Sequence, residues 1–269
     1  MVTLKSAREI ETMRRSGKIT ATVLTELMQT AKAGMTTSDL DQIAERGIRE
    51  RGGIPTFKGY HGFPATICAS VNDEVVHGIP GDYVLQDGDL LSIDIGTTLD
   101  GYVSDTAVTI PIGTISPEAQ RLLDVTQECL MIGIAQMQRG NHVGDIGAAV
   151  QRYAEDRGYG VVRELAGHGV GTAMHEEPQV PNYGKPGTGL ELRAGLVLAV
   201  EPMITQGDRK VEILKDGWTV VTADGKLAAH FEHTIAVTDD GPRILTLRDY
   251  GEHPDVAKYV PGAERVQTH

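Results

Sequence analysis

The sequence has few cysteines, no excess of positive charge and no long apolar run, and each shortage excludes a class of protein. Only Cys68 and Cys129 occur among 269 residues, which excludes a disulfide framework and favours a reducing compartment. The formal net charge of −12 argues against specific nucleic-acid binding. Apolar runs are too short to cross a membrane, and the start, MVTLKSAREIETMRRSGK, lacks the pattern of a signal peptide. We therefore expect a cytoplasmic protein that binds no membrane.

Four acidic residues stand in apolar, strand-like stretches, where a globular protein tolerates charge least. They are Asp94 in LLSIDIG, Asp105 in YVSDTAVTI, Glu201 in LVLAVEPMI and Glu232 in HFEHTIAV. None of these stretches contains Lys or Arg, and a buried carboxylate without a counter-charge either takes up a proton or binds a cation. One such acid alone is usually exposed or ion-paired, but four together predict a metal cluster.

The spacing of the first two acids fits a shared site. We expect Asp94 and Asp105 on two antiparallel strands joined by a turn centred on Leu99 and Asp100, which would set the two acids directly opposite each other. Directly opposed residues have Cβ atoms about 5 Å apart on one face of the sheet. Two carboxylates at that separation could bind a common pair of ions.

Parts of the sequence recur 106 or 107 positions later in the chain. The residues Gly34, Asp39, Leu40, Arg51 and Gly52 recur 106 positions later as Gly140, Asp145, Ile146, Arg157 and Gly158. At an offset of 107, His61 falls on His168 and Asp94 falls on Glu201. These matches predict two copies of one supersecondary unit, each contributing acids to a central site. We expect a single catalytic domain over residues 1–269, with one half at about 1–113, the other at about 114–246, and a polar C-terminal tail at 247–269.

Hydrophobic periodicity and capping residues predict helices followed by β-rich stretches. We expect helices from a capping box at Ser6 and Glu9 to about Gly34, through residues 40–48, from Ser116 and Pro117 towards Gly140, and over 145–157. Strand-like runs cover residues 65–71, 74–76, 90–96, 102–110, 196–204, 210–221 and 228–237. Asp-Gly pairs at 100–101, 216–217 and 224–225 predict hairpin turns. This order favours an α+β fold with a largely antiparallel sheet.

Several long segments resemble the type I methionine aminopeptidases. They are GYHGFPATICASVNDEVVHGIPGD, LLSIDIGTTLDGYVSDTA, ELAGHGVGTAMHEEPQVPNYG, LVLAVEPM and AAHFEHTIAVT, in that order and over nearly the whole chain. The resemblance implies the pita-bread fold, in which two pseudo-symmetric halves enclose a curved, largely antiparallel sheet with helices on its outer face. It also implies a dinuclear metal site whose ligands correspond to Asp94, Asp105, His168, Glu201 and Glu232.

This ligand set has a consistent chemistry. Two divalent ions would cancel the charge of four carboxylates, and oxygen ligands with one imidazole are compatible with Co, Mn, Fe or Zn. Paired ions lower the pKa of a bound water and polarise a peptide carbonyl. By resemblance, Glu201 also acts as the general base towards that water.

Two further histidines match family residues that line the cleft. By resemblance, His77 contacts the scissile amide nitrogen, and His175 holds the carbonyl oxygen and its developing charge. Without their flanking motifs, VVHGIP and AMHEEP, each would be interpreted as an ordinary partly buried histidine. The sequence assigns no such role to His230, His233, His61 or His142, although His61 is expected at the cleft rim beside Tyr60.

The resemblance further implies an apolar pocket for a methionine side chain. The substrate-binding positions are Phe57, Tyr60, Phe63, Cys68, His77, Met174, His175 and Trp218. Many bacterial relatives carry an aromatic residue where Met174 stands and Tyr where Phe63 stands. No basic group adjacent to Cys68 is evident, so we expect it to be a pocket wall and not a nucleophile.

The implied activity is metal-dependent removal of the initiator methionine from nascent proteins whose second residue is small. Expected partners are nascent polypeptides that begin with Met and, transiently, the ribosome, with the basic first helix as a contact and the enzyme as a monomer. An Xaa-Pro aminopeptidase or prolidase of the same fold is one alternative, although those relatives carry an additional N-terminal domain. A non-catalytic pita-bread binding protein is another, disfavoured because all five ligand positions are intact. The absence of a type II insertion and of a eukaryotic zinc-binding extension favours a bacterial or organellar origin.

Overall fold

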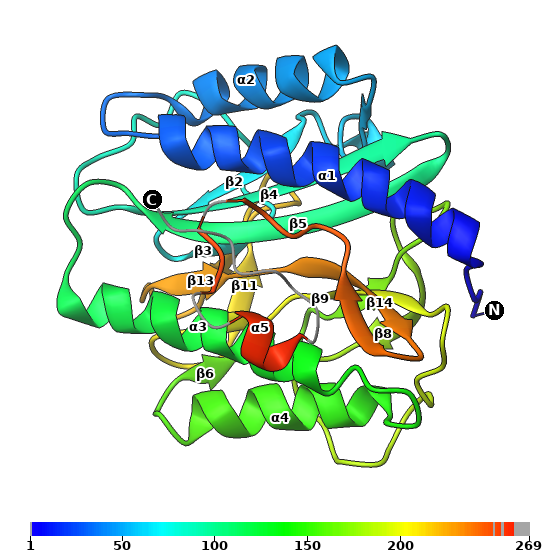
Figure 1. Ribbon diagram of the computed structural model, residues 1–269. Coiled ribbons are helices and arrows are strands. Elements are labelled where there is room, and N and C mark those ends of the chain that lie inside the picture. The colour runs from blue at the N-terminus through cyan, green and yellow to red at the C-terminus, as the bar shows by residue number, and fades with distance from the viewer. Residues whose placement is uncertain (1, 250, 254–255, 261–269) are drawn as a thin grey trace.

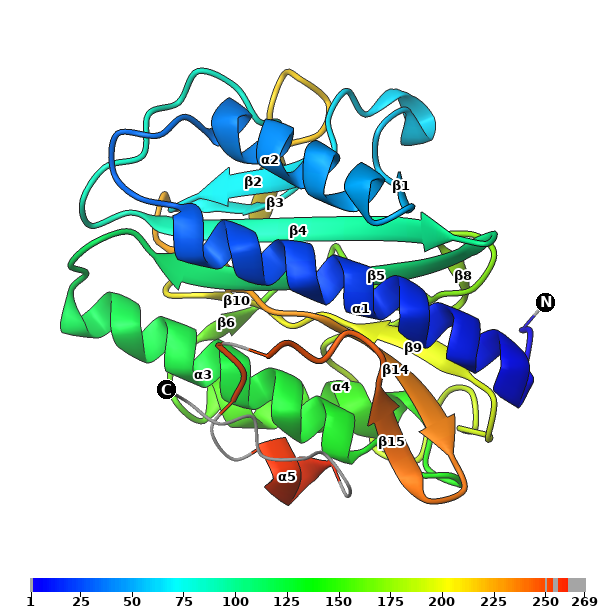
Figure 2. The same ribbon diagram turned by 45° about the horizontal axis from the view of Figure 1, so that its top comes forward.

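The computed structural model describes residues 2–249, 251–253 and 256–260 and places helices on the outside of antiparallel sheets (Figure 1). Helices α1 (Ala7–Thr30) and α2 (Thr37–Glu50) lie at the top of the molecule in this view, and α3 (Pro117–Ala135) and α4 (Val143–Glu155) lie at the bottom. The short helix α5 (Val256–Tyr259) packs beside α3 (Figure 2). This arrangement confirms the predicted α+β class. No helix in the described part of the chain is long and apolar enough to cross a membrane.

Capping residues start the first helix where the sequence predicts. The Ser6 hydroxyl accepts a hydrogen bond from the Glu9 backbone N–H, and the Glu9 carboxylate accepts one from the Ser6 N–H, which completes the capping box. Helices α1 and α3 both end about one turn before Gly34 and Gly140, earlier than predicted. Each of these glycines instead forms the following turn with a φ of 91°, a conformation that residues with a side chain rarely adopt.

The hairpin of β4 (Leu90–Leu99) and β5 (Tyr102–Pro111) carries the first two acids in a register that differs from the prediction. Its turn consists of Asp100 and Gly101, which have φ values of 49° and 80°, as a tight two-residue hairpin turn requires. The turn therefore falls on the Asp-Gly pair that was predicted as a hairpin turn, one residue later than the turn centred on Leu99 and Asp100. Asp94 pairs with Ala107, and the prediction that the two acids stand directly opposite each other is wrong. Asp94 and Asp105 are diagonal neighbours on the same face, still close enough to interact.

Within the described residues, the strands form four small antiparallel sheets. The first contains β1 (Ile54–Pro55), β4, β2 (Ile67–Val71) and β5, and the second contains β15 (Gly241–Ile244), β14 (His233–Thr238), β9 (Val197–Val200), β7 (Gly167–Gly169) and β8 (Glu176–Val180). The third contains β13 (Ala228–His230), β10 (Met203–Thr205) and β6 (Gly160–Val161), and the fourth contains β11 (Val211–Ile213), β12 (Val220–Thr222) and β3 (Glu74–Val76). A single turn of 3-10 helix, Tyr60–Gly62, precedes β2.

Several strand and turn predictions need correction. The predicted runs over 210–221 and 228–237 each divide into two strands, β11 with β12 and β13 with β14. The run over residues 196–204 is interrupted between β9 and β10 at Glu201 and Pro202, because proline has no N–H to donate to a sheet ladder. The Asp216–Gly217 pair lies between the paired strands β11 and β12, as predicted, but the Asp224–Gly225 pair does not close a hairpin. Its flanking strands pair elsewhere, β12 with β11 and β3, and β13 with β10.

Hydrogen bonds join β5 to the chain around Glu232, where segments far apart in the sequence meet. The Glu232 N–H donates to the Ala107 carbonyl over 2.9 Å, and the Thr106 hydroxyl donates to the Glu232 carbonyl over 2.6 Å. The Thr234 hydroxyl donates to the Asp105 carbonyl over 2.7 Å. This junction places acids from β5 and from the start of β14 next to each other.

Corresponding positions of the sequence repeat make the same contacts. The Gly34 N–H donates to the Leu85 carbonyl and the Gly140 N–H to the Leu192 carbonyl, each over 2.9 Å. The second glycines of the motif, Gly52 and Gly158, have φ values of 79° and 81°. Equal backbone geometry at equivalent positions is what a duplicated unit would produce.

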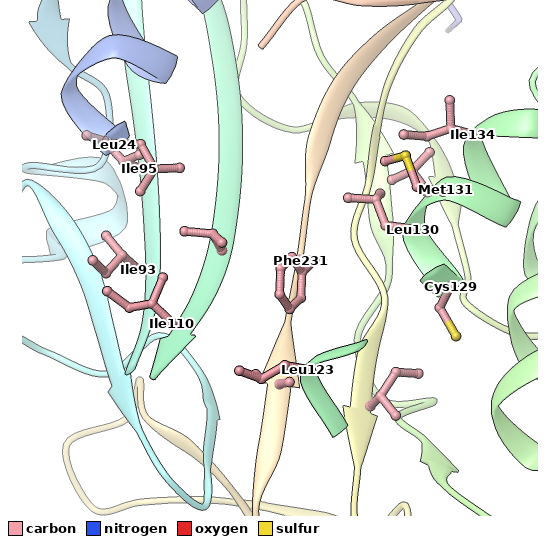
Figure 3. Close-up of a cluster of buried hydrophobic side chains, with 14 of the residues drawn as sticks. Leu24, Ile93, Ile95, Ile110, Leu123, Cys129, Leu130, Met131, Ile134 and Phe231 are labelled. Atoms are coloured by element: carbon pink, nitrogen blue, oxygen red, sulfur yellow. The ribbon is translucent and has the colours of Figure 1, made fainter. Parts of the chain in front are cut away.

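One large apolar core joins the helices to the sheets (Figure 3). Phe231 stands between Ile93 and Ile110 of the β4–β5 hairpin and Leu130 of α3, and Leu123 of the same helix lies below it in this view. The described part of the predicted polar tail also packs onto this core, because Val256 and Val260 are buried there. Residues 250, 254–255 and 261–269 of that tail lie outside the described residues.

Candidate metal centre and active site

The structure brings the predicted site residues to one cavity of about 440 Å³. Its walls include the five predicted ligands, Asp94, Asp105, His168, Glu201 and Glu232, and the eight predicted substrate residues, Phe57, Tyr60, Phe63, Cys68, His77, Met174, His175 and Trp218. His61, which was expected at the rim, also lines the cavity. Four residues that the sequence did not indicate complete the wall: Val76, Leu165, Ala166 and Met203. Among the described residues, no Lys or Arg lines this cavity.

The predicted ligands converge from five segments of the chain. Asp94 and Asp105 come from β4 and β5, and His168 comes from β7. Glu201 directly follows β9, and Glu232 directly precedes β14. One ligand atom each from Asp105, His168 and Glu232 lies within 4.8 Å of the other two, which is the spacing of groups that share a metal ion. His168 Nε2 also lies 3.6 Å from Glu201 Oε1.

Burial and mutual repulsion shift the pKa of each acid upward. Burial raises the pKa of Asp94 to about 7. The pKa values of Asp105, Glu201 and Glu232 lie well above their usual range, first because of burial and then because of the neighbouring carboxylates. Buried oxygens of Asp94, Asp105 and Glu232 have no hydrogen-bond partner in the part of the chain that is described. Such orphaned acids fit divalent cations, which would replace the protons.

His168 has the geometry of a neutral metal ligand. Its Nδ1 lies 2.9 Å from the Gly169 carbonyl oxygen, which assigns the proton to Nδ1 and leaves the Nε2 lone pair facing the carboxylates. Burial lowers the pKa of His168 to about 4, so the ring is neutral near pH 7. Gly167 before it allows close packing, because a Cβ there would lie 2.3 Å from the Ala199 carbonyl oxygen.

His77 and His175 line the cavity without joining the acid cluster. Burial lowers the pKa of His77 to about 4, and its φ of 61° is a strained backbone conformation of the kind that concentrates at functional sites. His175 Nδ1 lies 2.8 Å from the Tyr60 hydroxyl, and its ring centroid lies 4.2 Å from that of His168. Burial also lowers the pKa of His175, which keeps it neutral beside His168.

The apolar end of the cavity consists of aromatic and sulfur-containing side chains. Phe63 and Trp218 meet edge to face with ring centroids 5.2 Å apart, and Phe57 and Cys68 pack in the same cluster. A Cβ on Gly96 would lie 2.6 Å from the Phe57 ring, so the glycine makes room for that ring. Burial and the nearby acids raise the pKa of the Cys68 thiol well above its usual range, which supports a wall and not a nucleophile.

The loop that carries Met174 and His175 is held by a partly buried ion pair that the sequence did not reveal. Lys5 Nζ lies 2.5 Å from Glu176 Oε2, and the Glu176 Oε1 atom accepts a hydrogen bond from the Thr172 backbone N–H over 2.9 Å. Lys5 is buried and therefore does not belong to a basic surface of the first helix.

His230 is a second residue at the site that sequence reasoning missed. It is 2% exposed, and its Nε2 lies 3.7 Å from Glu201 Oε2 and 3.9 Å from Glu232 Oε2. Burial lowers its pKa to about 3, so these contacts are not ion pairs of a charged ring. The signal was present in the sequence, because residues two apart in an extended segment share a face and Glu232 follows His230 by two.

Comparison with known proteins identifies the family. The sequence pattern of metallopeptidase family M24 matches residues 11–239. The chain is 50% identical over 247 residues to the methionine aminopeptidase of Clostridium perfringens, covering 92% of this chain and 99% of the relative. It is 52% identical over 246 residues to methionine aminopeptidase 1 of Bacillus subtilis, covering 91% and 99%.

Solved structures agree with this family assignment. The crystal structure of methionine aminopeptidase from Thermotoga maritima superposes with a TM-score of 0.90 at 42% identity, covering 91% of this chain and 99% of that one. This match confirms the pita-bread fold. The prolidase from Pyrococcus furiosus, at 20% identity and a TM-score of 0.75, shares the fold alone, and this chain covers only 65% of it. The chain belongs to metallopeptidase family M24 and, within it, to the methionine aminopeptidases.

Proposed function

We propose that the five clustered residues, Asp94, Asp105, His168, Glu201 and Glu232, hold two divalent metal ions and that the adjoining cavity binds an N-terminal methionine. The chain is a methionine aminopeptidase, a metal-dependent hydrolase that removes methionine from the N-terminus of a peptide. The observation that supports the site most directly is the group of three buried acids, Asp94, Asp105 and Glu232, beside the largely buried Glu201, with no Lys or Arg among the described residues that line the cavity. When bound, the ions supply a Lewis acid and a water acidic enough to be hydroxide near pH 7.

Glu201 is the proposed general base. The family resemblance assigns it this role, and its carboxylate lies within the cluster, with Oε1 3.6 Å from His168 Nε2 and Oε2 3.7 Å from His230 Nε2. The backbone of Glu201 is fixed by a hydrogen bond, which Asn182 Nδ2 donates to the Glu201 carbonyl over 2.9 Å. The carboxylate is therefore attached to a fixed point of the chain while it exchanges the proton.

His77 and His175 are the proposed contacts to the scissile peptide. If the Tyr60 hydroxyl donates to His175 Nδ1, the His175 proton resides on Nε2, which can then donate a hydrogen bond to the substrate carbonyl as negative charge develops there. Both rings are neutral near pH 7 because burial lowers their pKa values. Neutral donors suit this role since they do not compete with the ions for the carboxylates.

The apolar end of the cavity is the proposed methionine pocket. A thioether packs well against aromatic rings, and Phe57, Phe63 and Trp218 provide them. Preference for a small second residue, such as Gly, Ala, Ser, Thr, Pro, Val or Cys, is proposed from the family resemblance. The test compares cleavage of Met-Ala-Ser, Leu-Ala-Ser, Met-Lys-Ser and an Xaa-Pro peptide with Co, Mn, Fe or Zn restored in turn. We expect Met-Ala-Ser to be cleaved fastest; comparable cleavage of all four would show a general aminopeptidase.

We further propose that the enzyme is a cytoplasmic monomer that acts on nascent chains during transient ribosome association. Cys68 and Cys129 are both free and buried, which is consistent with a reducing compartment. On the first helix, Arg14 and Arg15 form exposed ion pairs with Glu11 and Asp100, which are weak enough to exchange for contacts with RNA. Co-sedimentation with ribosomes at low and physiological salt would test this contact, and its absence at both would contradict it.

We also propose that the catalytic domain consists of two related halves, at about 1–113 and 114–246. The equal φ values and equal hydrogen bonds at Gly34 and Gly140 support a duplicated unit. Unfolding in one cooperative transition, followed by circular dichroism and by enzymatic activity, would support a single domain. Two separate transitions would contradict it.

A further inference from the structure

Both ring nitrogens of His230 are buried and lack a hydrogen-bond partner among the described residues. The ring is buried, at 2% exposure, and its Nε2 points between Glu201 Oε2 and Glu232 Oε2, at 3.7 and 3.9 Å. By contrast, His168 Nδ1 contacts a backbone carbonyl and His175 Nδ1 contacts a tyrosine hydroxyl. A buried polar group without a partner is costly, so an unpaired imidazole facing two carboxylates requires an explanation.

The backbone at His230 is held firmly, so the ring position is a fixed feature of the fold. The His230 N–H donates to the Thr109 hydroxyl oxygen over 2.8 Å, and the Thr109 hydroxyl lies 2.9 Å from the His230 carbonyl oxygen, to which it donates. Thr109 is itself within 2.7 Å of the Ser92 hydroxyl on β4. The strands that carry Asp94 and Asp105 therefore also position His230.

Two roles fit this position, a metal ligand or a hydrogen-bond donor, and the second ring nitrogen distinguishes them. A ligating histidine almost always donates its other N–H to a carbonyl or carboxylate, as His168 does through Nδ1. His230 Nδ1 has no such acceptor within the described chain, so a ligating tautomer would bury an unpaired N–H. With the proton on Nε2, the N–H faces two acceptors, and only a lone pair of the neutral ring remains unpaired.

We propose that His230 is a positioning residue that donates its Nε2–H to the carboxylates of Glu201 and Glu232 and so orients both for metal binding. The inference rests on the proposed metal site. The present distances exceed a charge-assisted hydrogen bond by about 1 Å, so a small carboxylate rotation closes either contact. Glu201 then lies between two imidazoles, with Oε1 towards His168 and Oε2 towards His230.

The first experiment compares His230→Leu, which removes the donor, with His230→Gln, which keeps an N–H of similar reach. Metal-free protein is titrated with Mn(II) by calorimetry, and kcat and KM are measured for Met-Ala-Ser. We expect His230→Leu to bind Mn(II) about 10- to 100-fold more weakly and to lose kcat, with KM changed little, because the methionine pocket is formed by other residues. His230→Gln should recover most of the affinity, and His142→Leu, the same change away from the cavity, should leave both quantities unaltered.

A second measurement does not depend on whether the variants fold. In NMR of the nitrogen-labelled, Zn(II)-loaded wild type, the His230 ring should carry its proton on Nε2. A metal-bound Nε2 or a proton on Nδ1 would overturn the proposal, as would equal Mn(II) affinity and kcat in wild type and His230→Leu. Wild-type protein that binds no ion would instead contradict the metal site itself, so the two failures can be told apart.

Discussion

Glu232 and His233 are adjacent in the chain but belong to two different clusters of buried charged groups. Only the cluster around His233 contains its own cation, Arg248. Glu232 faces the cavity with the other acids, where no Lys or Arg is among the described lining residues. His233 faces away and lies 3.2 Å from Glu252 Oε2, while Arg248 Nε lies 3.1 Å from Glu252 Oε1. The Arg248 and Glu252 side chains are 1% and 4% exposed. The Glu232 side chain is 2% exposed, so both clusters are shielded from water.

The two clusters shift carboxyl pKa values in opposite directions. At Glu232, burial and the neighbouring acids both raise the pKa, well above the usual range. At Glu252, burial also raises the pKa, but Arg248 and the hydrogen bond from His233 outweigh it and lower the pKa to about 2. Burial alone therefore does not indicate function. A buried acid cluster is a binding site when its counter-charge must come from outside the chain.

The largest expected effect follows from removing one acid of the cavity. Asp105→Asn should lower turnover of Met-Ala-Ser about a thousandfold or more, because the ions stabilise the transition state by several kcal/mol. Elemental analysis should show reduced metal content. Asp100→Asn in the turn of the same hairpin is the matched control and should keep full activity. Unchanged metal content and turnover in Asp105→Asn would remove the distinction between the two clusters.

The same chemical change in the other cluster should affect stability and not chemistry. Glu252→Gln leaves Arg248 buried without a counter-charge, which should lower the free energy of unfolding by about 3 kcal/mol while kcat stays near that of the wild type. Urea unfolding measures the first quantity and a peptide assay the second. The exposed acid Glu191 provides a control, since Glu191→Gln should unfold like the wild type. Wild-type stability in Glu252→Gln would contradict the role assigned to this ion pair.

Removing a neutral donor from the cavity should separate rate from metal binding. His175→Ala and His77→Ala should each lower kcat about a hundredfold, because each loses a hydrogen bond that forms in the transition state. Both variants should retain their ions, as measured by elemental analysis after dialysis, since neither side chain belongs to the acid cluster. Loss of both ions, or turnover equal to that of the wild type, would count against these roles.

In metal-free protein, each cluster should lower the free energy of unfolding over its own range of pH, which gives the pH profile an acid limb and a neutral limb. The pKa of Glu252 is about 2 in the folded protein, below its ordinary 4.5, so its stabilisation is lost as pH falls from 4.5 towards 2. The pKa of Asp94 is about 7, above its ordinary 3.8, so its contribution is full below 3.8 and is lost as pH rises through 7. Each carboxyl group with a shifted pKa can change the free energy of unfolding by up to about 1.4 kcal/mol per pH unit.

Urea midpoints measured from pH 3 to pH 8, with and without Mn(II), would check these limbs. Adding the ion should remove the loss on the neutral side, because a cation replaces the protons, and should leave the acid limb unchanged. Identical profiles in the presence and absence of the ion would show that the cavity acids do not carry the neutral-side loss.

The smallest effect is expected at exposed ion pairs, which set the baseline for both clusters. Arg139 and Asp239 are 68% and 71% exposed and 2.6 Å apart. Arg139→Ala should change the free energy of unfolding by no more than about 0.5 kcal/mol in urea titrations, because water already screens the pair. A larger loss would mean that charge pairing stabilises this protein regardless of burial.

Local sequence signals predicted much of the fold, and tertiary contacts decided the remainder. Ser6 and Glu9 predicted the start of α1 because a cap acts within one turn of helix. The register of the β4–β5 hairpin was missed because it depends on which two residues adopt positive φ, and Asp100 with Gly101 satisfies that turn better than Leu99. A shift of one residue in the turn changed the partner of every residue in both strands.

By itself, the sequence determined that four acids lie in apolar strands without nearby basic residues, and its long motifs determined the family. Those features are local, because charge and periodicity can be read from neighbouring positions. Only the tertiary structure decided that Arg248 neutralises Glu252, that Lys5 holds the loop before His175, and that His230 faces Glu201. Lys5 and Glu176 are 171 positions apart in the chain. Pairings between segments so distant depend on how the sheets and helices pack, and no local pattern of residue types encodes them.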